Sequence, residues 1–381
     1  MQQNDQKRSR LSWRTAVIAV LLAAAAGVGI AALFHANRPG ASMDLPVVSC
    51  GERTLNSRDF AYYYWTEYYL LLESGYAPAT DVPLEEQRYD GDRTWKDYML
   101  EQAMQTVGET MALVSAADQA GFTLPEKTQE NLDAVAAKLD ENAANAGFIK
   151  KNGEADVDAF LADSYGYGAT EKAFLAYLQD AYLAAAYADT LFYGEDFSDA
   201  EVSAYYDSFA ADYAAAGVDK TDTYTVSIRD LIFVPNSTEE ADWQAAQDKA
   251  EALLEQWEEN GGTTEAFAAL TTEDAMDTTY SSLRPGVLSD KVDAWCFEEM
   301  RQPGDTVIFR SADGVHLICY YAGAEKPIWY EQALSDLRYE AYASTLRNLM
   351  DQTPCKLDET RLELHTPQSL LAEAELGDAT K

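Results

Sequence analysis

The chain has 381 residues, a length that allows two or three domains. It carries 65 acidic against 28 basic side chains, a formal net charge of -37. A chain this acidic repels phosphate backbones, which excludes nucleic-acid binding. The hydrophobic content of 47% and the aromatic content of 12% are too high for a disordered chain and predict a folded core.

The N-terminus has the pattern of a membrane anchor. Residues 15–34 are twenty consecutive uncharged and mostly apolar residues. As a helix they would span roughly 30 Å, the thickness of the hydrocarbon layer. Four basic residues precede this segment and one follows closely: Lys7, Arg8, Arg10, Arg14 and Arg38. This bias predicts a single-pass protein of the cell membrane, with a cytoplasmic tail at 1–14 and its body on the extracytoplasmic face.

The N-terminus has two other possible interpretations, a cleaved signal peptide and a lipoprotein signal. A cleaved signal peptide has an apolar core of about 7–15 residues followed by a small-x-small site. Here the core is longer, and His35-Ala-Asn-Arg38 follows it. A lipoprotein cleavage box at Val47–Cys50 should adjoin the apolar core, but mixed residues lie between them. An uncleaved anchor is therefore the preferred prediction.

The four cysteines leave the disulfide state open. They are Cys50, Cys296, Cys319 and Cys355. None forms a CxxC motif, which excludes zinc ribbons and thioredoxin-like redox motifs. An extracytoplasmic location permits disulfides, and four cysteines allow three pairings among which the sequence does not choose. Four small buried hydrophobic side chains are an equally good interpretation.

After a linker at 35–46, the first part of the body is predicted to be mainly helical. Val47–Leu55 has the pattern of a strand and a turn around Gly51. From Asn56 apolar residues recur at steps of three and four, which predicts a helix. This stripe comprises Phe60, Tyr63, Tyr64, Tyr68, Leu71 and Leu72. It is most simply core, and the alternative interpretation is the wall of a peptide-binding site.

Further helices follow, with their ends marked by capping residues. A long helix is predicted from Trp95 to Ala120, with Gly121 as its C-terminal cap. Thr123–Glu126 and Ser198–Glu201 have the pattern of capping boxes, and each is expected to open a helix. Residues 127–195 continue as helices between them.

Residues 223–323 change to an α+β pattern of about 100 residues. The predicted elements are a strand at 224–234, a helix at 241–258, a short helix holding Phe267 and Leu270, a loop at 271–285, a helix holding Val292 and Trp295, and strands at 304–309 and 315–321. The last two strands are separated by Ser311–Gly314, whose Asp-Gly pair is typical of a tight hairpin.

A last long helix is predicted at 327–350, followed by a partly disordered tail. The expected parts are therefore 1–14 cytoplasmic tail, 15–34 anchor, 35–46 linker, 47–222 helical lobe, 223–324 α+β domain, 325–350 C-terminal helix and 351–381 tail.

The sequence lacks the motifs of several common enzyme and metal-binding classes. Only three histidines are present: His35, His316 and His365. There is no HExxH, GxSxG or P-loop motif, and no acidic cluster has EF-hand spacing. We therefore expect neither a cofactor nor a metal.

The segment Asp313–Ile318, taken with Ile228–Ile232 and the order of elements around them, resembles the parvulin family of peptidyl-prolyl isomerases. Residues 115–126 and 198–206 resemble the helical chaperone lobe of SurA and PrsA foldases. The resemblance covers roughly residues 47–350. It implies an α+β fold in which a small antiparallel sheet flanked by helices is inserted before a last helix that returns to a helical chaperone lobe.

The resemblance also implies a set of site residues. His316 matches the histidine of the last strand, and Asp230 stands where the family usually has a second histidine. The substrate-binding positions implied are Leu288 and Val292 in an apolar proline pocket, Tyr280 near a third wall and Asp274 as a candidate acid of the preceding loop. Gly286, Phe297 and Gly304 match structural positions.

This sequence departs from the family pattern in two places. The first-strand histidine is replaced by Asp230, and the Gly-Gly-x-Leu-Gly turn is replaced by Thr278–Ser282. We expect Asp230 and His316 to face each other as a hydrogen-bonded pair in which the carboxylate raises the pKa of the imidazole. The alternative is that Asp230 points to solvent and His316 is a core residue.

The predicted function is that of a membrane-anchored extracytoplasmic foldase. Its partners would be unfolded or proline-containing exported polypeptides, whose X–Pro bonds it would isomerise in an apolar pocket. The barrier to this rotation is about 18–20 kcal/mol, and lowering it needs no nucleophile or metal. The alternatives are a holdase that lost turnover and a structural adaptor of the cell envelope. The sequence leaves the clients and the oligomeric state open.

Overall fold

The computed structural model describes residues 43–79, 82–298 and 301–371. The predicted anchor at 15–34 and the cytoplasmic tail at 1–14 lie outside these residues. Among the residues described, no helix is both long enough and apolar enough to cross a bilayer. The chain divides into two compact units, one of which is Phe197–Leu337, while the other ends at Asp196 and resumes at Arg338.

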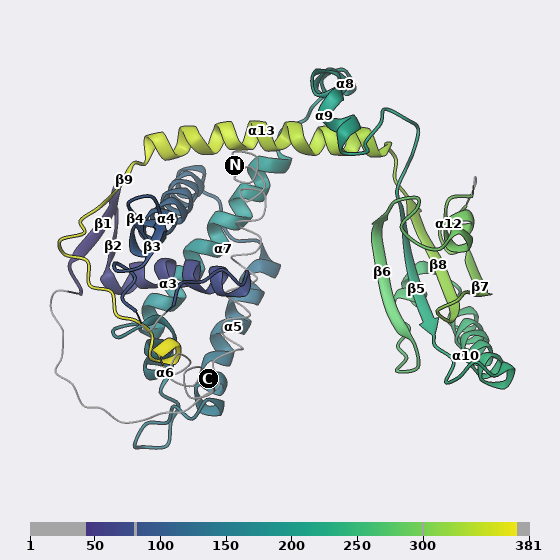
Figure 1. Ribbon diagram of the computed structural model, residues 1–381, viewed down its shortest axis with the longest axis horizontal. Helices are drawn as coiled ribbons and strands as arrows, with labels where there is room; N and C mark the ends of the chain where they lie inside the picture. The colour runs from purple at the N-terminus through teal and green to yellow at the C-terminus, as the bar shows by residue number, and fades with distance from the viewer. Residues whose placement is uncertain (1–42, 80–81, 299–300, 372–381) are drawn as a thin grey trace. The chain divides into compact units, whose positions relative to one another are not determined.

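In the first unit, three short strands join the two ends of the described chain. Strands β1 (Pro46–Cys50) and β2 (Arg53–Asn56) form the predicted hairpin, and Gly51 takes the positive φ of 59° that its turn needs. Strand β9 (Cys355–Leu357) pairs with the other side of β1 (Figure 1). A three-residue strand has too little pattern to be recognised in sequence, which is why this part of the tail was predicted to be partly disordered.

A disulfide links β1 to β9. It joins Cys50 and Cys355, which are directly opposite each other in the strand pairing and 305 residues apart in sequence. The other two cysteines, Cys296 and Cys319, are buried free thiols. The structure thereby selects one pairing where the sequence allowed several.

Helix α3 (Ser57–Glu73) follows β2 directly. The side chain of Asn56 caps it by accepting hydrogen bonds from the backbone N–H groups of Arg58 and Asp59. Its aromatic stripe is core, because Phe60, Tyr63, Tyr64 and Tyr68 are all at most 3% exposed. The alternative of a peptide-binding wall is wrong for these four side chains.

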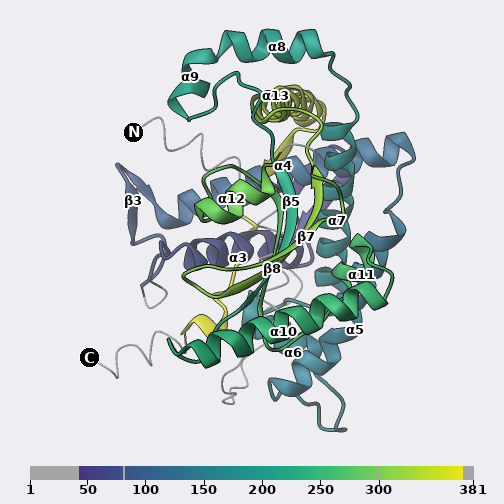
Figure 2. The ribbon, with the colours of Figure 1, turned by 90° about the vertical axis from the view of Figure 1, so that its right-hand side faces the viewer.

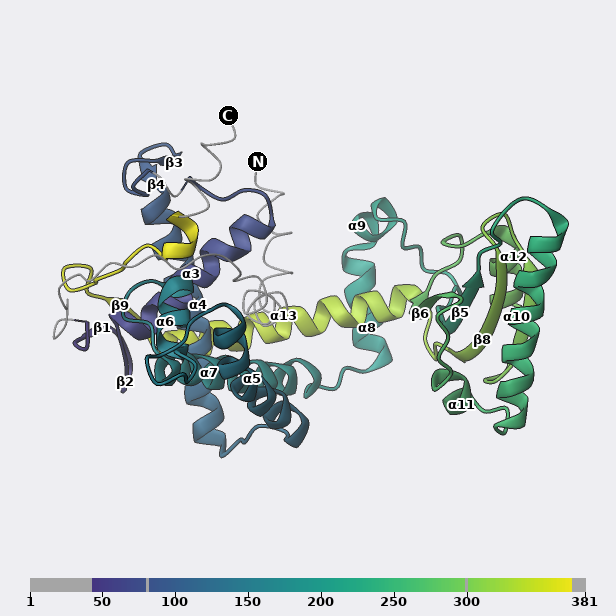
Figure 3. The same ribbon diagram turned by 90° about the horizontal axis from the view of Figure 1, so that it is seen from below.

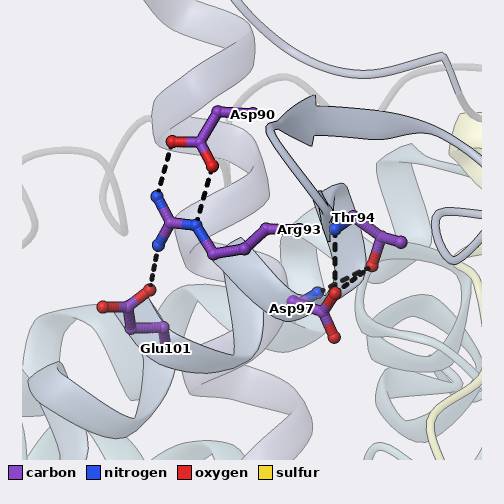
Figure 4. Close-up of polar contacts among 5 residues, drawn as sticks. All are labelled: Asp90, Arg93, Thr94, Asp97 and Glu101. Atoms are coloured by element: carbon purple, nitrogen blue, oxygen red, sulfur yellow. Dashed lines mark hydrogen bonds and ion pairs between the residues drawn. The ribbon is translucent and has the colours of Figure 1, made fainter.

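Helix α4 (Trp95–Ala120) has the predicted bounds. At its start Thr94 and Asp97 form a capping box, in which each side chain accepts a hydrogen bond from the other residue's backbone N–H (Figure 4). Gly121 ends the helix with a φ of 65°.

A small hairpin, β3 (Arg88–Asp90) and β4 (Arg93–Thr94), precedes α4. The guanidinium group of Arg93 donates hydrogen bonds to the carboxylates of Asp90 and Glu101 (Figure 4). The sequence did not predict this hairpin.

Three more helices complete the first unit. They are α5 (Glu126–Asn145), α6 (Val157–Tyr165) and α7 (Glu171–Tyr193). The capping box expected at 123–126 is wrong, because Pro125 occupies the N-cap position and no side chain caps α5. Helices α3 to α7 share one core of aromatic and aliphatic side chains.

The second unit begins with two short helices, α8 (Asp199–Ser208) and α9 (Ala210–Ala215). The Ser198–Glu201 capping box is confirmed. These helices share a cluster with the start of α13 (Ile328–Gln352), so the structure groups them with the second unit instead of with the helical lobe predicted at 47–222. The later part of α13 packs against α4 and α7, as Tyr342, Leu346 and Leu349 show.

The rest of the second unit is built on a four-stranded antiparallel sheet. Its strands are β5 (Val226–Phe233), β6 (Met276–Leu283), β7 (Thr306–Arg310) and β8 (Val315–Gly323), in the order β6-β5-β8-β7. The loop predicted at 271–285 is wrong, since it contains β6. Five of the eight residues of this edge strand are exposed and only Leu283 is buried, so it lacks the apolar alternation by which strands are recognised.

Helices cover the two faces of this sheet. Helices α10 (Glu240–Glu259) and α11 (Thr264–Ala268) pack on the face that carries Leu231 and Leu317. Helix α12 (Asp290–Cys296) packs on the opposite face, with Ile228 and Ile318 (Figure 2). The long α10 runs beside the sheet, whereas α12 has only seven residues (Figure 3).

Candidate functional site

The pairing of β5 with β8 brings Asp230 and His316 together. His316 lies opposite Ile232 in the register, and Asp230 is two residues before Ile232, so both side chains leave the same face of the sheet. The imidazole Nδ1 lies 2.9 Å and 3.1 Å from the two carboxylate oxygens of Asp230. Both residues are buried, with 3% and 2% of their surface exposed. The hydrogen-bonded pair expected from the sequence is therefore present.

A second carboxylate holds the other nitrogen of His316. The Nε2 atom lies 3.0 Å from Oδ1 of Asp313, which belongs to the turn between β7 and β8. The turn depends on Gly314, where a Cβ would meet the carbonyl oxygen of Phe233 at 2.8 Å. Asp313 and its turn thus fix the imidazole from the side opposite to Asp230.

This arrangement favours the protonated imidazole, in which both nitrogens donate. Burial alone lowers the pKa of His316, but the hydrogen bonds to Asp230 and Asp313 outweigh it and raise the pKa above its ordinary value. The hydrogen bond from His316 in turn lowers the pKa of the Asp313 carboxyl group. The two acidic side chains thus stabilise the protonated form of His316 relative to a free imidazole.

Apolar side chains surround this chain of hydrogen bonds. The ring of Phe309 stacks on the imidazole with a centroid separation of 5.3 Å and an interplanar angle of 16°. Phe309 belongs to a cluster that also includes Tyr280, Leu288 and Val292. The cluster gives this face of the sheet an apolar and aromatic surface beside His316.

Five of the six predicted site residues lie on this face. Asp230 and His316 are bonded to each other, while Leu288 and Val292 pack there from α12 and the loop before it. Tyr280 on β6 lies opposite Ile228, and burial, followed by the negative charge of Asp230, raises its pKa. Of these three apolar and aromatic positions, Leu288 and Tyr280 are partly buried, whereas Val292 is 1% exposed.

The sixth residue, Asp274, lies elsewhere. It forms an ion pair with Lys249 of α10, the helix that covers the opposite face. The sequence did not place Asp274, because residues 271–285 were predicted to be a loop and the strand that begins at Met276 was not expected. The structure thus separates Asp274 from the other five residues.

Two residues of this face were not predicted as site residues, namely Asp313 and Phe309. Each carried a signal in the sequence. Asp313 stands three residues before His316 in the Asp-Gly turn, and the tight hairpin pairs Phe309 directly with His316. A register drawn for the predicted hairpin would have found both.

A buried charge also lies on the opposite face. Arg229, which is 6% exposed, donates hydrogen bonds to the carbonyl oxygens of Phe267 and Leu270 and to the carboxylate of Asp277 on β6. It ties the edge strand and α11 to β5. This arrangement is a structural counterpart to the Asp230–His316 pair one residue away.

Two further features bear on what the second unit can bind. Among the residues that the structure describes, no group of three or more His, Cys, Asp or Glu side chains could hold a metal ion. A cavity of about 370 Å³ opens at the other end of the sheet, among the start of β5, the ends of β6 and β8, and the start of α13. His316 does not line this cavity.

Comparisons of this chain with known proteins give matches only among solved structures. No family model and no curated protein matches its sequence. Among solved structures, PrsA from Bacillus subtilis matches with 12% identity over 69% of this chain and 89% of its own, at a TM-score of 0.34. The PrsA foldase of Lactococcus lactis matches with 10% identity over 87% and 99%, at a TM-score of 0.31. A SurA-like chaperone of Campylobacter jejuni matches with 11% identity over 83% and 100%, at a TM-score of 0.29.

Proposed function

We propose that this protein is an extracytoplasmic foldase that binds unfolded exported polypeptides and isomerises their X–Pro bonds on the His316 face of the sheet. One observation carries the proposal. The imidazole of His316 is fixed on both nitrogens by Asp230 and Asp313 and lies under the ring of Phe309, beside an apolar cluster.

Isomerisation of an X–Pro bond breaks no covalent bond and requires only that the twisted amide be stabilised. A planar amide owes its barrier of about 18–20 kcal/mol to resonance, and a twisted amide has lost that resonance and much of its charge separation. An apolar surface therefore favours the twisted state over the planar one. The rings of Phe309 and Tyr280 and the side chain of Leu288 would form that surface for the proline ring.

In this proposal Asp230 and His316 are positioning residues. They are too deeply buried to touch a substrate, but His316 supports the Phe309 ring and fixes the β7–β8 turn through Asp313. The pair would hold the apolar surface in one geometry. This role replaces the direct catalytic role that the sequence suggested for the two residues.

The location is part of the proposal. The segment 15–34 would anchor the chain, and the body would lie on the extracytoplasmic face. The disulfide between Cys50 and Cys355 supports this placement, because disulfides persist in oxidising compartments.

A holdase without turnover is the second candidate. Two observations favour it: Asp230 stands where the resembled family has a histidine, and the cavity of the second unit lies away from His316. Such a protein would bind the same unfolded chains and delay their aggregation.

The test is a protease-coupled isomerase assay with the full-length chain in a mild detergent, using a short proline-containing peptide. We expect wild-type turnover above the uncatalysed rate and a loss of about tenfold or more in Phe309→Ala and Leu288→Ser. Asp274→Asn, on the opposite face, serves as the matched control and should keep full turnover. Suppression of aggregation without any turnover would select the holdase instead.

A further inference from the structure

The outer edge of β6 is open for pairing. In the sheet order, β6 is an edge strand, and within the described residues it pairs only with β5. The other edge, β7, is partly occupied, since the ammonium group of Lys291 donates to the carbonyl oxygen of Arg310. Edge backbone groups can be satisfied in register only by another extended chain.

The composition of β6 does nothing to prevent such pairing. Natural edge strands are commonly protected by lysine, proline or a bulge that twists them away. The strand Met276–Leu283 contains neither lysine nor proline, and four of its eight residues are exposed aspartate, threonine or serine. A bulge at Ser281–Ser282 interrupts its pairing with β5, so the regular part of the edge is Met276–Tyr280. Its one acidic side chain, Asp277, is held by Arg229 of β5. The edge is therefore polar and accessible.

The cavity of about 370 Å³ lies at the end of this edge. Ser281, Ser282 and Arg284 line it from the end of β6, and Glu331 and Ser335 line it from α13. The start of α13 is fixed to the sheet, because the backbone N–H of Ile328 donates to the carbonyl of Thr223 at 2.8 Å. The N–H of Ala324 donates similarly to Thr225 at 2.9 Å. The two sides of the cavity, the sheet and α13, are therefore joined by backbone hydrogen bonds.

The cavity offers an arginine that has no partner. Among the described residues, Arg284 makes neither a hydrogen bond nor an ion pair, although the chain has 65 acidic side chains. Ser281, Ser282 and Thr225, which carry hydroxyl groups, line the same space. A guanidinium group with neighbouring hydroxyl donors is suited to a carboxylate. Glu331 also lines the cavity and opposes such a ligand.

We infer that the β6 edge and this cavity together bind an extended polypeptide segment, which adds to β6 as a fifth strand and places a carboxylate against Arg284. The carboxylate would be the C-terminus of the segment or a Glu or Asp side chain. This site differs from the His316 face: along β8, His316 and Ala322 are six residues apart, or about 20 Å. It holds a client whether or not the client contains proline.

The experiment measures fluorescence anisotropy with the full-length chain and three labelled, proline-free decapeptides of alternating threonine and valine. One ends in a free carboxylate, one is amidated, and one is amidated with an internal glutamate. We expect Arg284→Ala to weaken binding of at least one carboxylate peptide by about tenfold, and the amidated peptide without glutamate to be unaffected. The peptide that responds identifies the source of the carboxylate.

Two further variants sharpen the test. Glu331→Gln should tighten binding of the responsive peptide by about twofold to threefold, because it removes an opposing charge. Arg88→Ala, an exposed arginine of the other unit, is the matched control and should change nothing. Hydrogen exchange of the β6 amides should slow when the peptide is bound.

The inference is overturned if the three peptides bind wild type and Arg284→Ala alike, or if bound peptide leaves exchange of the β6 amides unchanged. Since the peptides lack proline, either result leaves the isomerase proposal standing. A failure of the isomerase assay likewise leaves this site untouched.

Discussion

The two faces of the four-stranded sheet treat buried charge differently. On the α10 face, Arg229 is satisfied by two backbone carbonyls and Asp277, under the cover of α10 and α11. On the α12 face, Asp230 and His316 are satisfied by each other and by Asp313, under a helix of seven residues. Arg229 and Asp230 are adjacent in β5, but Arg229 holds the fold together and Asp230 belongs to the candidate site. They differ in the helices that cover them, which are α10 and α11 over Arg229 and the short α12 over Asp230.

The largest expected effect is on the α10 face. Arg229→Leu leaves the carbonyls of Phe267 and Leu270 without their donor and removes the side-chain tie between Asp277 of β6 and β5. Leaving a buried carbonyl oxygen without its donor costs about 1–3 kcal/mol of unfolding free energy, and this variant leaves two. Urea denaturation would measure it. A loss below about 1 kcal/mol would show that this face does not depend on the arginine.

A smaller loss of stability, with a larger loss of turnover, is expected on the other face. Asp230→Asn keeps the shape of the side chain but weakens a charged hydrogen bond to His316, which costs about 1.5–3 kcal/mol. Isomerase turnover should fall about tenfold in the folded variant, because Phe309 and the turn lose their support. Turnover equal to wild type would reduce the pair to a structural role, like that of Arg229.

The two faces should also differ in their response to pH. The pKa of His316 is raised in the folded protein, so its contribution to stability is complete below about 6.5, the ordinary histidine value, and is lost as pH rises through the folded pKa. The difference in unfolding free energy between wild type and His316→Gln should therefore shrink from about pH 5.5 to 9. A difference that grows over this range would contradict the charged-pair account, and Arg229→Leu should show no such slope.

The smallest effect concerns Asp274. Its ion pair with Lys249 is exposed, with 58% and 51% of the two side chains accessible. Exposed ion pairs contribute about 0–1 kcal/mol, so Asp274→Asn should unfold at nearly the wild-type urea concentration. A clear loss of turnover in this variant would place Asp274 in the site after all.

The elements that could be predicted from the sequence are those with a regular apolar spacing or a clear capping residue. Helix α4 was predicted with its observed bounds because its apolar spacing is regular and Gly121 marks its C-terminal end. Asp230 and His316 were paired because the resembled family has two histidines at these positions, and the structure brings the two side chains together. Strand β6 was missed because an exposed polar edge has no apolar alternation. Asp313 was missed because its contact with His316 depends on the geometry of the hairpin turn. The pairing of Cys355 was left open because its partner lies 305 residues away.

The most direct test of the account is the turnover of a proline-containing peptide by Phe309→Ala beside the Asp274→Asn control. The account predicts that the first variant folds, as its thermal transition would show, yet loses about tenfold or more of its turnover while the control keeps it. Equal turnover in both variants would contradict the claim that the His316 face isomerises prolyl bonds.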